Sequence, residues 1–323
     1  MATRKEVAER AGVSVATVSY VVNGTKHVTP EVKARVEEAV KELHYSPNLV
    51  AKGLATRKTH HVAMLVNNLR NPYYAEMLAG AQAVASKKGY IVSIIMVDYS
   101  NEEEVIKLAS RGVDGVIDAT YTDVTNELLE EGIPFVASNT SALISYRKGI
   151  FEAVEALKEK GHENIAFLSG LKLDTKRNGR YQHLREAFEF YGIPVQEGLM
   201  IEGNEREETD EAAGIQAVKN LLKTGLPFTA IVALNDLMAF GAMRELKNQG
   251  LRIPEDVSVI GCDNVEMGKY SIPSLSTLNV DSFDVGKLLM KKLIADINHK
   301  QEQSHVITAS YIERESVGEC PRK

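Results

Sequence analysis

The chain contains little cysteine and no apolar run long enough to cross a membrane. Only Cys262 and Cys320 are cysteines among 323 residues, and their spacing matches no metal-binding or redox motif. No apolar stretch approaches the ~18 residues that a membrane span needs. The N-terminus leads straight into a polar helix, without the apolar segment of a signal peptide. We therefore expect a cytoplasmic protein with two free thiols and no membrane partner.

Signatures of catalysis and of nucleotide binding are also missing. The sequence has neither the Gly-x-Gly-x-x-Gly pattern nor the Walker spacing. Its eight histidines are scattered, and the pair His60-His61 marks a linker rather than a metal site. Asp281 and Asp284 lack a paired base. We expect no enzymatic activity, no metal and no cofactor.

Charge is distributed unevenly along the chain. The whole sequence has a net charge of −6, which by itself argues against a nucleic-acid partner. Residues 1–60, however, hold ten Lys/Arg and six Glu, a net +4, which leaves −10 for the remainder. A cationic head on an anionic body indicates that the head binds phosphate while the body repels DNA.

The first 45 residues have the pattern of three short helices. Thr3 and Glu6 form a capping box, and Gly12 suits the left-handed conformation at the end of the first helix. Ser14 caps a second helix, and Thr29-Pro30 begins a third. A helix, a tight turn and a second helix are typical of a unit that places the second helix in the major groove. The alternative is a small three-helix bundle that serves protein contacts.

The second helix carries side chains suited to DNA. Val15 and Ala16 can touch thymine methyl groups, although they cannot form bidentate hydrogen bonds. Thr17, Ser19 and Asn23 can reach phosphates or bases. The DNA-binding residues that we predict in the head are Thr3, Ser14, Val15, Ala16, Thr17, Ser19, Tyr20 and Asn23.

From His61 onward, short apolar runs alternate with amphipathic helical stretches. Repeated units of this kind predict parallel sheets covered on both faces. Their number exceeds one comfortable sheet, so we expect two subdomains with a cleft between them. The apolar runs span residues 61–66, 90–97, 115–119, 134–137, 164–169, 230–234 and 257–262. The helical stretches span residues 73–88, 149–160, 180–191, 211–222, 237–249 and 283–298.

Polar and aromatic side chains follow several of the apolar runs. Ligands of open α/β sheets bind at the carboxyl ends of the strands, so these side chains are candidate ligand contacts. Amides, carboxylates and aromatic faces together suit a neutral sugar or polyol. For any single Asn or Asp, the alternative is a helix cap or a turn. The candidates found in this way include Asn71, Tyr73, Tyr74, Asn139, Asn235 and Asp263.

Two segments of the head, residues 12–24 and 43–48, closely resemble the LacI/GalR family of bacterial transcription regulators. They read Gly12-Val13-Ser14-Val15-Ala16-Thr17-Val18-Ser19-Tyr20-Val21-Val22-Asn23-Gly24 and Leu43-His44-Tyr45-Ser46-Pro47-Asn48. The resemblance continues through residues 71–76, 235–242 and 254–264 of the body. It implies a helix-turn-helix head with a hinge helix, on a body like a periplasmic binding protein. It also implies a repressor that binds a palindromic operator as a homodimer.

The segment after the head is the predicted hinge. Ser46-Pro47 can start a short helix that ends near Leu54, but nine residues are too few for a stable helix in water. The resemblance implies that this helix forms on operator DNA and that Leu54 wedges a base step open in the minor groove. Gly53 stands where serine is usual and costs about 1 kcal/mol of helix propensity. The predicted DNA contacts here are Asn48, Ala51, Lys52 and Leu54.

The resemblance also assigns effector contacts in the body. Asn235 and Asp263 match the effector-contacting pair, and Asn139 falls where an aspartate is common. Arg180 matches a binding arginine, although His183-Leu184 replaces the usual Gly-aromatic pair and leaves Arg177 as a rival. The predicted effector-binding residues, for a sugar or sugar derivative, are Asn71, Tyr73, Tyr74, Asn139, Arg180, Asn235 and Asp263.

These patterns divide the chain into a helix-turn-helix domain (1–45), a hinge and linker (46–60) and an effector-binding and dimerisation domain (61–323). Within the last we expect one subdomain of residues 61–144 plus 282–303 and another of residues 145–281 plus 304–323. A long amphipathic tail is missing, so we expect a dimer. The alternative function is a catabolite-control regulator whose co-signal is a phosphorylated carrier protein. An exported solute-binding protein is a more distant alternative.

Overall fold

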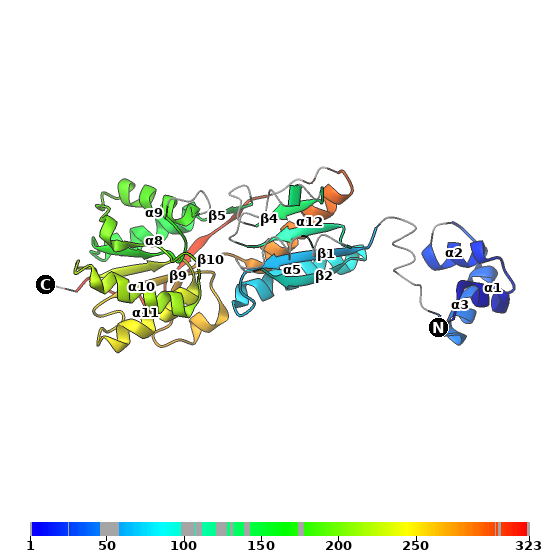
Figure 1. The fold of residues 1–323 in the computed structure, drawn as a ribbon, viewed down its shortest axis with the longest axis horizontal. Coiled ribbons are helices and arrows are strands. Elements are labelled where there is room, and N and C mark those ends of the chain that lie inside the picture. The colour runs from blue at the N-terminus through cyan, green and yellow to red at the C-terminus, as the bar shows by residue number, and fades with distance from the viewer. Residues whose placement is uncertain are drawn as a thin grey trace. The chain divides into compact units, whose positions relative to one another are not determined.

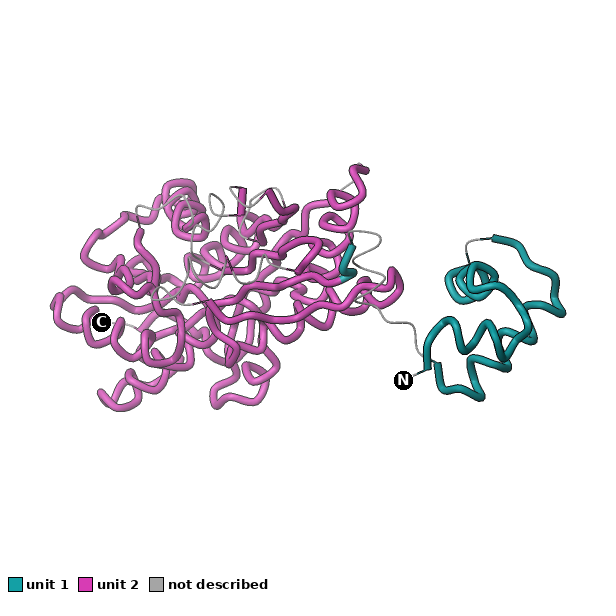
Figure 2. The backbone as a smooth tube through the Cα atoms, turned by 45° about the vertical axis from the view of Figure 1, so that its right-hand side comes forward, with its two compact units in different colours: residues 1–60 teal, residues 61–323 magenta. Residues whose placement is uncertain are grey.

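A computed structural model describes most of the chain as two compact units, residues 1–60 and 61–323 (Figure 2). The described residues are 2–24, 26–45, 58–97, 107, 112–120, 128–129, 132–138, 143–173, 178–300, 302 and 305–321. Among these residues, no helix is both long enough and apolar enough to cross a membrane.

The first unit contains the three predicted helices, α1 (Arg4–Ala11), α2 (Val15–Asn23) and α3 (Pro30–Glu42) (Figure 1). The predicted capping box is confirmed, because Thr3 and Glu6 each bond to the backbone of the other. Ser14 accepts a hydrogen bond from the Thr17 amide at 3.1 Å. Gly12 ends α1 with φ of 64°, a conformation that glycine adopts without steric cost.

Small apolar side chains form the core of this unit. Val7, Val18 and Val36 are completely buried, and alanines of α1 and α3 pack beside them. Because alanine side chains are small, the helices can cross at close range. A core of few residues is then enough to pack the three helices together. The Arg4 guanidinium donates to the Tyr45 hydroxyl at 3.1 Å and ties α1 to the end of the unit.

The second unit begins with a four-stranded parallel sheet in the order β2-β1-β3-β4. Its strands are β1 (His61–Val66), β2 (Ile91–Met96), β3 (Gly115–Asp118) and β4 (Phe135–Ala137). Helices α5 (Pro72–Ala85) and α12 (Ser282–Ile297) pack together against it, and a 3-10 turn, η1 (Ser86–Lys88), follows α5. Alternate β1 residues face the two sides, since Met64 joins the α5/α12 core and Leu65 joins a separate cluster.

The contact between α5 and α12 depends on two glycines. A Cβ at Gly80 would collide with the carbonyl of Phe283, and a Cβ at Gly286 would collide with the carbonyl of Met77. The two backbones therefore approach more closely than any side chain at these positions allows.

A six-stranded sheet forms the rest of the second unit, in the order β12-β10-β9-β8-β6-β7. Its strands are β6 (Ile165–Leu168), β7 (Met200–Ile201), β8 (Ala230–Ala233), β9 (Ser258–Cys262), β10 (Ser276–Asn279) and β12 (Ser310–Ile312). The prediction of a parallel sheet is confirmed for five strands, but β12 runs antiparallel to β10. An antiparallel strand can join the sheet edge without a crossover helix.

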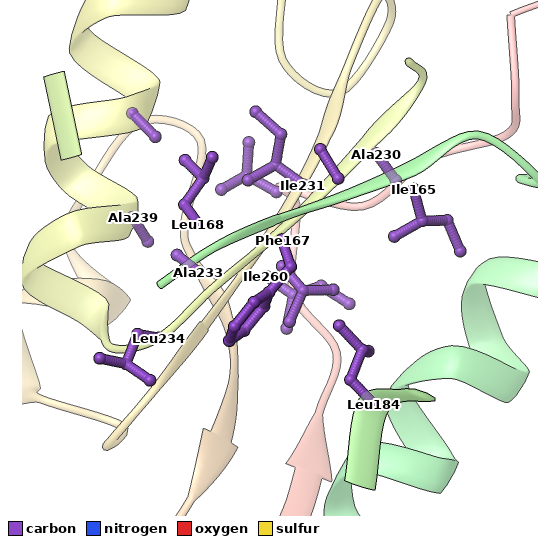
Figure 3. Packing of buried hydrophobic residues seen from close by; sticks show 14 of the residues in the cluster. Ile165, Phe167, Leu168, Leu184, Ala230, Ile231, Ala233, Leu234, Ala239 and Ile260 are labelled. Atoms are coloured by element: carbon purple, nitrogen blue, oxygen red, sulfur yellow. The ribbon is translucent and has the colours of Figure 1, made fainter. Parts of the chain in front are cut away.

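Helices cover both faces of the six-stranded sheet. In Figure 1, α8 (Arg147–Glu159) and α9 (Gly179–Phe190) lie on one face, and α10 (Glu211–Lys223) and α11 (Asp236–Asn248) lie on the other. Figure 3 shows the buried core between them, with Leu184 of α9 and Ala239 of α11 on opposite sides of Phe167. Two 3-10 turns, η2 (Glu197–Leu199) and η3 (Glu266–Lys269), lie in the connections.

The chain passes between the two sheets in three places. The first follows β5 (Ile144–Ser145), which pairs in parallel with β11 (Ile307–Thr308). The second runs from β10 to α12, and the third runs from β11 to β12 (Figure 1). These three crossings join the two sheets as two lobes of one unit. The side chains that follow the strands of the two lobes are described below.

The α5/α12 contact can be tested by adding one methyl group. We expect Gly80→Ala and Gly286→Ala each to lower the free energy of unfolding by about 2 kcal/mol or more, because the new Cβ must push two backbones apart. Gly179→Ala is the matched control, since its Cβ would meet nothing within 4 Å and its φ is not positive. Urea unfolding measures all three, and a Gly286→Ala variant as stable as Gly179→Ala would contradict the close approach.

Candidate DNA-binding surface and effector site

The first turn of α2 projects away from the core of the head. Ser14, Val15 and Ala16 are exposed, and Val15, although apolar, is 45% exposed. Val18 is buried and anchors the opposite side of the same helix. The structure therefore brings the predicted base-contacting residues together on one free end of α2.

The remaining predicted DNA contacts of the head surround this end. Ser14 and Thr17 share a hydrogen bond of 2.9 Å between their hydroxyls. Tyr20 is partly buried, and the Lys26 ammonium lies 4.8 Å from its ring centroid. Thr3, Ser19 and Asn23 are exposed or partly exposed. Asn48, Ala51, Lys52 and Leu54 lie outside the described residues, so their roles stay predictions.

In the body, the side chains that follow β1 and β9 lie close together. Asn71 follows β1, and its side chain lies near enough to the Asp263 carboxyl, which follows β9, to favour the charged form of that carboxyl. Beside it, Arg70 Nη2 lies 3.6 Å from Asp210 Oδ2, so an ion pair also joins the loop after β1 to the start of α10. The strand-end candidates thus meet where one sheet faces the other.

Arg180 lies next to this contact, in the first turn of α9. Its Nη1 donates to the carbonyl of Leu234 at 2.7 Å and lies 3.6 Å from Cys262 Sγ. Its guanidinium also stacks on Tyr146, 4.7 Å from the ring centroid. Arg180 therefore stands at the ends of β8 and β9, where a ligand of both strands would lie.

Burial dominates the electrostatics of Asp263. It raises the pKa of this carboxyl to about 8, although Arg180 and the nearby Asn71 side chain favour the charged form. The charge of Asp236 raises the pKa further. The site thus contains a carboxyl that changes charge near neutral pH beside a guanidinium that does not.

The space beneath Arg180 is small. A cavity of about 10 Å³, lined partly by Phe167, Arg180 and Cys262, is on the scale of one water molecule. A larger ligand that contacts Arg180 must therefore displace internal contacts or part the lobes.

Two of the predicted asparagines are helix caps. Asn235 is fully buried, accepts from the Met238 amide at 2.9 Å and donates to the carbonyl of Thr209 at 2.9 Å. Asn71 caps α5 by accepting from the Tyr73 amide at 3.0 Å, and its side chain lies near the Asp263 carboxyl. The cap interpretation left open by the sequence therefore applies to both, but only Asn71 also joins the inter-lobe contact.

The other predicted effector residues are placed less centrally. Tyr74 is buried and Tyr73 is partly exposed, with their rings edge-on at 5.5 Å between centroids. Asn139 lies outside the described residues, and so does Arg177, the alternative to Arg180. The structure adds Tyr146 and Cys262, which the sequence analysis did not place in the site. Asp236, which follows Asn235, is buried, and its charge acts on Asp263.

A helical head with the free end of a second helix, followed by a two-lobed α/β body with polar groups between the lobes, defines a ligand-responsive DNA-binding regulator. A family model described as bacterial regulatory proteins, lacI family, matches residues 3–48, and one described as a periplasmic binding protein-like domain matches residues 154–317. The HTH-type transcriptional repressor PurR of Serratia proteamaculans is 34% identical over 340 residues, which cover 99% of this chain and 98% of that protein.

Solved structures agree with this similarity. The Lac repressor dimer bound to operator and the anti-inducer ONPF aligns with a TM-score of 0.82 at 26% identity, over 98% of this chain and 99% of that one. The transcriptional regulator CelR in complex with cellobiose aligns with a TM-score of 0.69 at 28% identity, over 98% and 100%. The chain belongs to the LacI family of bacterial transcription regulators.

The raised pKa of Asp263 predicts how stability depends on pH. Between the unfolded value near 3.8 and the folded value of about 8, the native state holds a proton that the unfolded state lacks. Stability from this group is therefore present at low pH and lost as pH rises to about 8, at no more than about 1.4 kcal/mol per pH unit. Asp236 contributes in the same direction only up to about pH 6.

Urea unfolding of wild type and Asp263→Asn between pH 6 and pH 9 isolates this group. We expect the wild-type stability to fall relative to that of the variant up to about pH 8 and then to run parallel with it. Parallel curves over the whole range would show that Asp263 does not titrate from a buried position.

Proposed function

We propose that this regulator is a repressor that binds a palindromic operator as a homodimer, and that a sugar or sugar derivative between the two lobes controls it. The observation that carries the proposal is the cluster of Asn71, Asp263 and Arg180 at the facing strand ends. The cellobiose held by the similar regulator CelR supports a sugar as the effector class.

The donors and acceptors of the cluster match the hydroxyl groups of a sugar. A hydroxyl can donate to the Asp263 carboxyl and accept from the Arg180 guanidinium. In doing so it would replace the Asn71 amide at Asp263 and the Leu234 carbonyl at Arg180. The exposed part of Tyr73 offers an aromatic face beside the same loop.

Control of DNA binding follows from where these contacts lie along the chain. Asn71 and Arg70 stand just past the end of β1, and β1 begins at His61, directly after the predicted hinge. A ligand that binds one relative position of the lobes more tightly than another shifts the population toward it. We infer that this shift changes the separation of the two hinges in a dimer and hence their folding on the operator.

An exposed apolar patch supports a homodimer. Met267, Tyr270 and Ile272 lie within and just after η3, and Ile272 is 95% exposed. Adjacent large apolar side chains at this exposure are typical of a surface that a partner covers. We assign this patch to contact with a second copy of the chain.

The operator part of the proposal predicts the effect of shortening the wedge. We expect Leu54→Ala to weaken binding to the specific operator by about tenfold or more, because the unstacked base step loses its apolar filling. Binding to a random duplex should change little, since phosphate contacts dominate it. Electrophoretic mobility shift at fixed salt measures both, and an equal loss on the two duplexes would remove Leu54 from the wedge role.

The effector part is tested by a thermal-shift screen of sugars, sugar phosphates, nucleosides and purines. A bound compound should raise the melting temperature of the wild type but not of Asp263→Ala, which loses the acceptor while its operator affinity stays within about twofold. Glu255→Ala is the control, because it removes an exposed carboxylate just before the strand that carries Asp263.

Two results would count against the sugar. A response by nucleosides or purines alone would change the effector class. No response to any compound, together with specific capture of a phosphorylated carrier protein, would favour the catabolite-control alternative.

A further inference from the structure

The turn after β9 has an unusual backbone. Asp263 has φ of 116° and Asn264 has φ of 54°, so two consecutive non-glycine residues occupy the left-handed region. Each such residue costs about 1–3 kcal/mol and persists only where its surroundings determine it. This turn is also the one that aims Asp263 at Asn71.

One buried carboxylate bonds to the residues that follow Asp263. Asp236, at the start of α11, is completely buried. Its Oδ2 accepts from the Val265 amide at 2.8 Å. Its Oδ1 accepts from the Thr277 hydroxyl of β10 at 2.6 Å, and this hydroxyl in turn accepts from the Asn264 amide at 3.3 Å. Asp236 therefore ties α11, the turn and β10 together.

The side chain of Asn264 is held from a second direction. Its Oδ1 accepts from Arg314, which follows β12 and also donates to the carbonyl of Leu275. Its Nδ2 donates to Asn279 Oδ1 at 2.9 Å. These bonds fix the side chain of Asn264, whereas Asp236 holds the backbone of the turn through the Thr277 hydroxyl and the Val265 amide.

We propose that Asp236 is a positioning residue of the effector site, which holds Asp263 and Asn264 in the left-handed conformation that presents the Asp263 carboxyl to the facing lobe. This assignment rests on the proposed function, in which Asp263 contacts the effector.

The electrostatics of Asp236 agree with this role. Burial raises its pKa to about 6, while the bonds from Thr277 and Val265 favour the charged form. Above that pH the carboxylate is ionised, and each bond that it accepts is charge-assisted and correspondingly strong. The turn is therefore held most firmly at neutral and higher pH.

Cys262, which immediately precedes Asp263, reports on the turn without any ligand. It is 1% exposed, and burial raises the pKa of its thiol far above the ordinary value, so it reacts only when the turn opens. Cys320→Ser makes it the single thiol of the chain. The experiment measures the rate of labelling of Cys262 by Ellman's reagent at pH 8 in this background.

Substitutions at three further positions separate a local role from a global one. Asp236→Asn removes the carboxylate charge, and Thr277→Val, which removes one of its donors, is the second test variant if Asp236→Asn fails to fold. The control is Leu199→Ala, or the milder Leu199→Val, at a buried residue beside β7 on the opposite edge of the sheet. Urea unfolding gives the free energy of unfolding of each variant. Each test variant is then compared with the Leu199 variant whose free energy of unfolding matches its own.

We expect Asp236→Asn and Thr277→Val to label at least about tenfold faster than the control of equal stability, because losing a bond to a charged group opens the turn locally. Rates that follow global stability alone in all variants would overturn the proposal.

The same proteins enter the thermal-shift screen with cellobiose and D-ribose. Fast labelling in the test variants, with no sugar bound by wild type, would leave the positioning role standing and refute the sugar. Sugar binding that is equal in wild type and Asp236→Asn, with unchanged labelling, would refute the positioning role and leave the sugar.

Discussion

The approach of Asn71 to the buried carboxyl of Asp263 is the contact on which the geometry of the effector site depends. A carboxylate in a protein interior is costly unless polar groups surround it, and here those that favour its charge come from two lobes, Asn71 from one and Arg180 from the other. Asp263 belongs to the six-stranded sheet, and Asn71 belongs to the loop after the four-stranded sheet. The state of one buried carboxyl is therefore linked to the relative position of the two lobes.

The central strands could be predicted from the sequence because they are apolar without interruption. A strand with helices on both faces has no polar side, and the run at residues 61–66 coincides with β1. The caps at Thr3 and Ser14 were equally visible, because each is a local pattern of a few residues. The short pairs β5 and β11 have only two residues each and leave no periodic signal.

Strand β10 shows why some elements were missed. It reads Ser-Thr-Leu-Asn, yet Ser276 and Thr277 are completely buried. Their hydroxyls are satisfied by Arg314 and Asp236, which are distant in the sequence. A polar strand of this kind is stable only because of these partners. The sequence near the strand does not predict them. The same limit applies to the site: strand-end residues such as Asp263 could be found, whereas Tyr146 beneath Arg180 required the fold.

The internal contacts of the site also constrain its ligand. Arg180 donates to the carbonyl of Leu234, and Asn71 lies beside the buried Asp263 carboxyl. An apolar ligand that entered between them would leave a partly buried donor and a buried acceptor without these partners, at a cost of about 1–3 kcal/mol for a fully buried group. A ligand with several hydroxyls can replace both contacts at once, since every hydroxyl donates and accepts. The number of hydrogen bonds then stays nearly the same when the ligand enters. What moves the lobes is the difference between the ligand's affinities for their two relative positions.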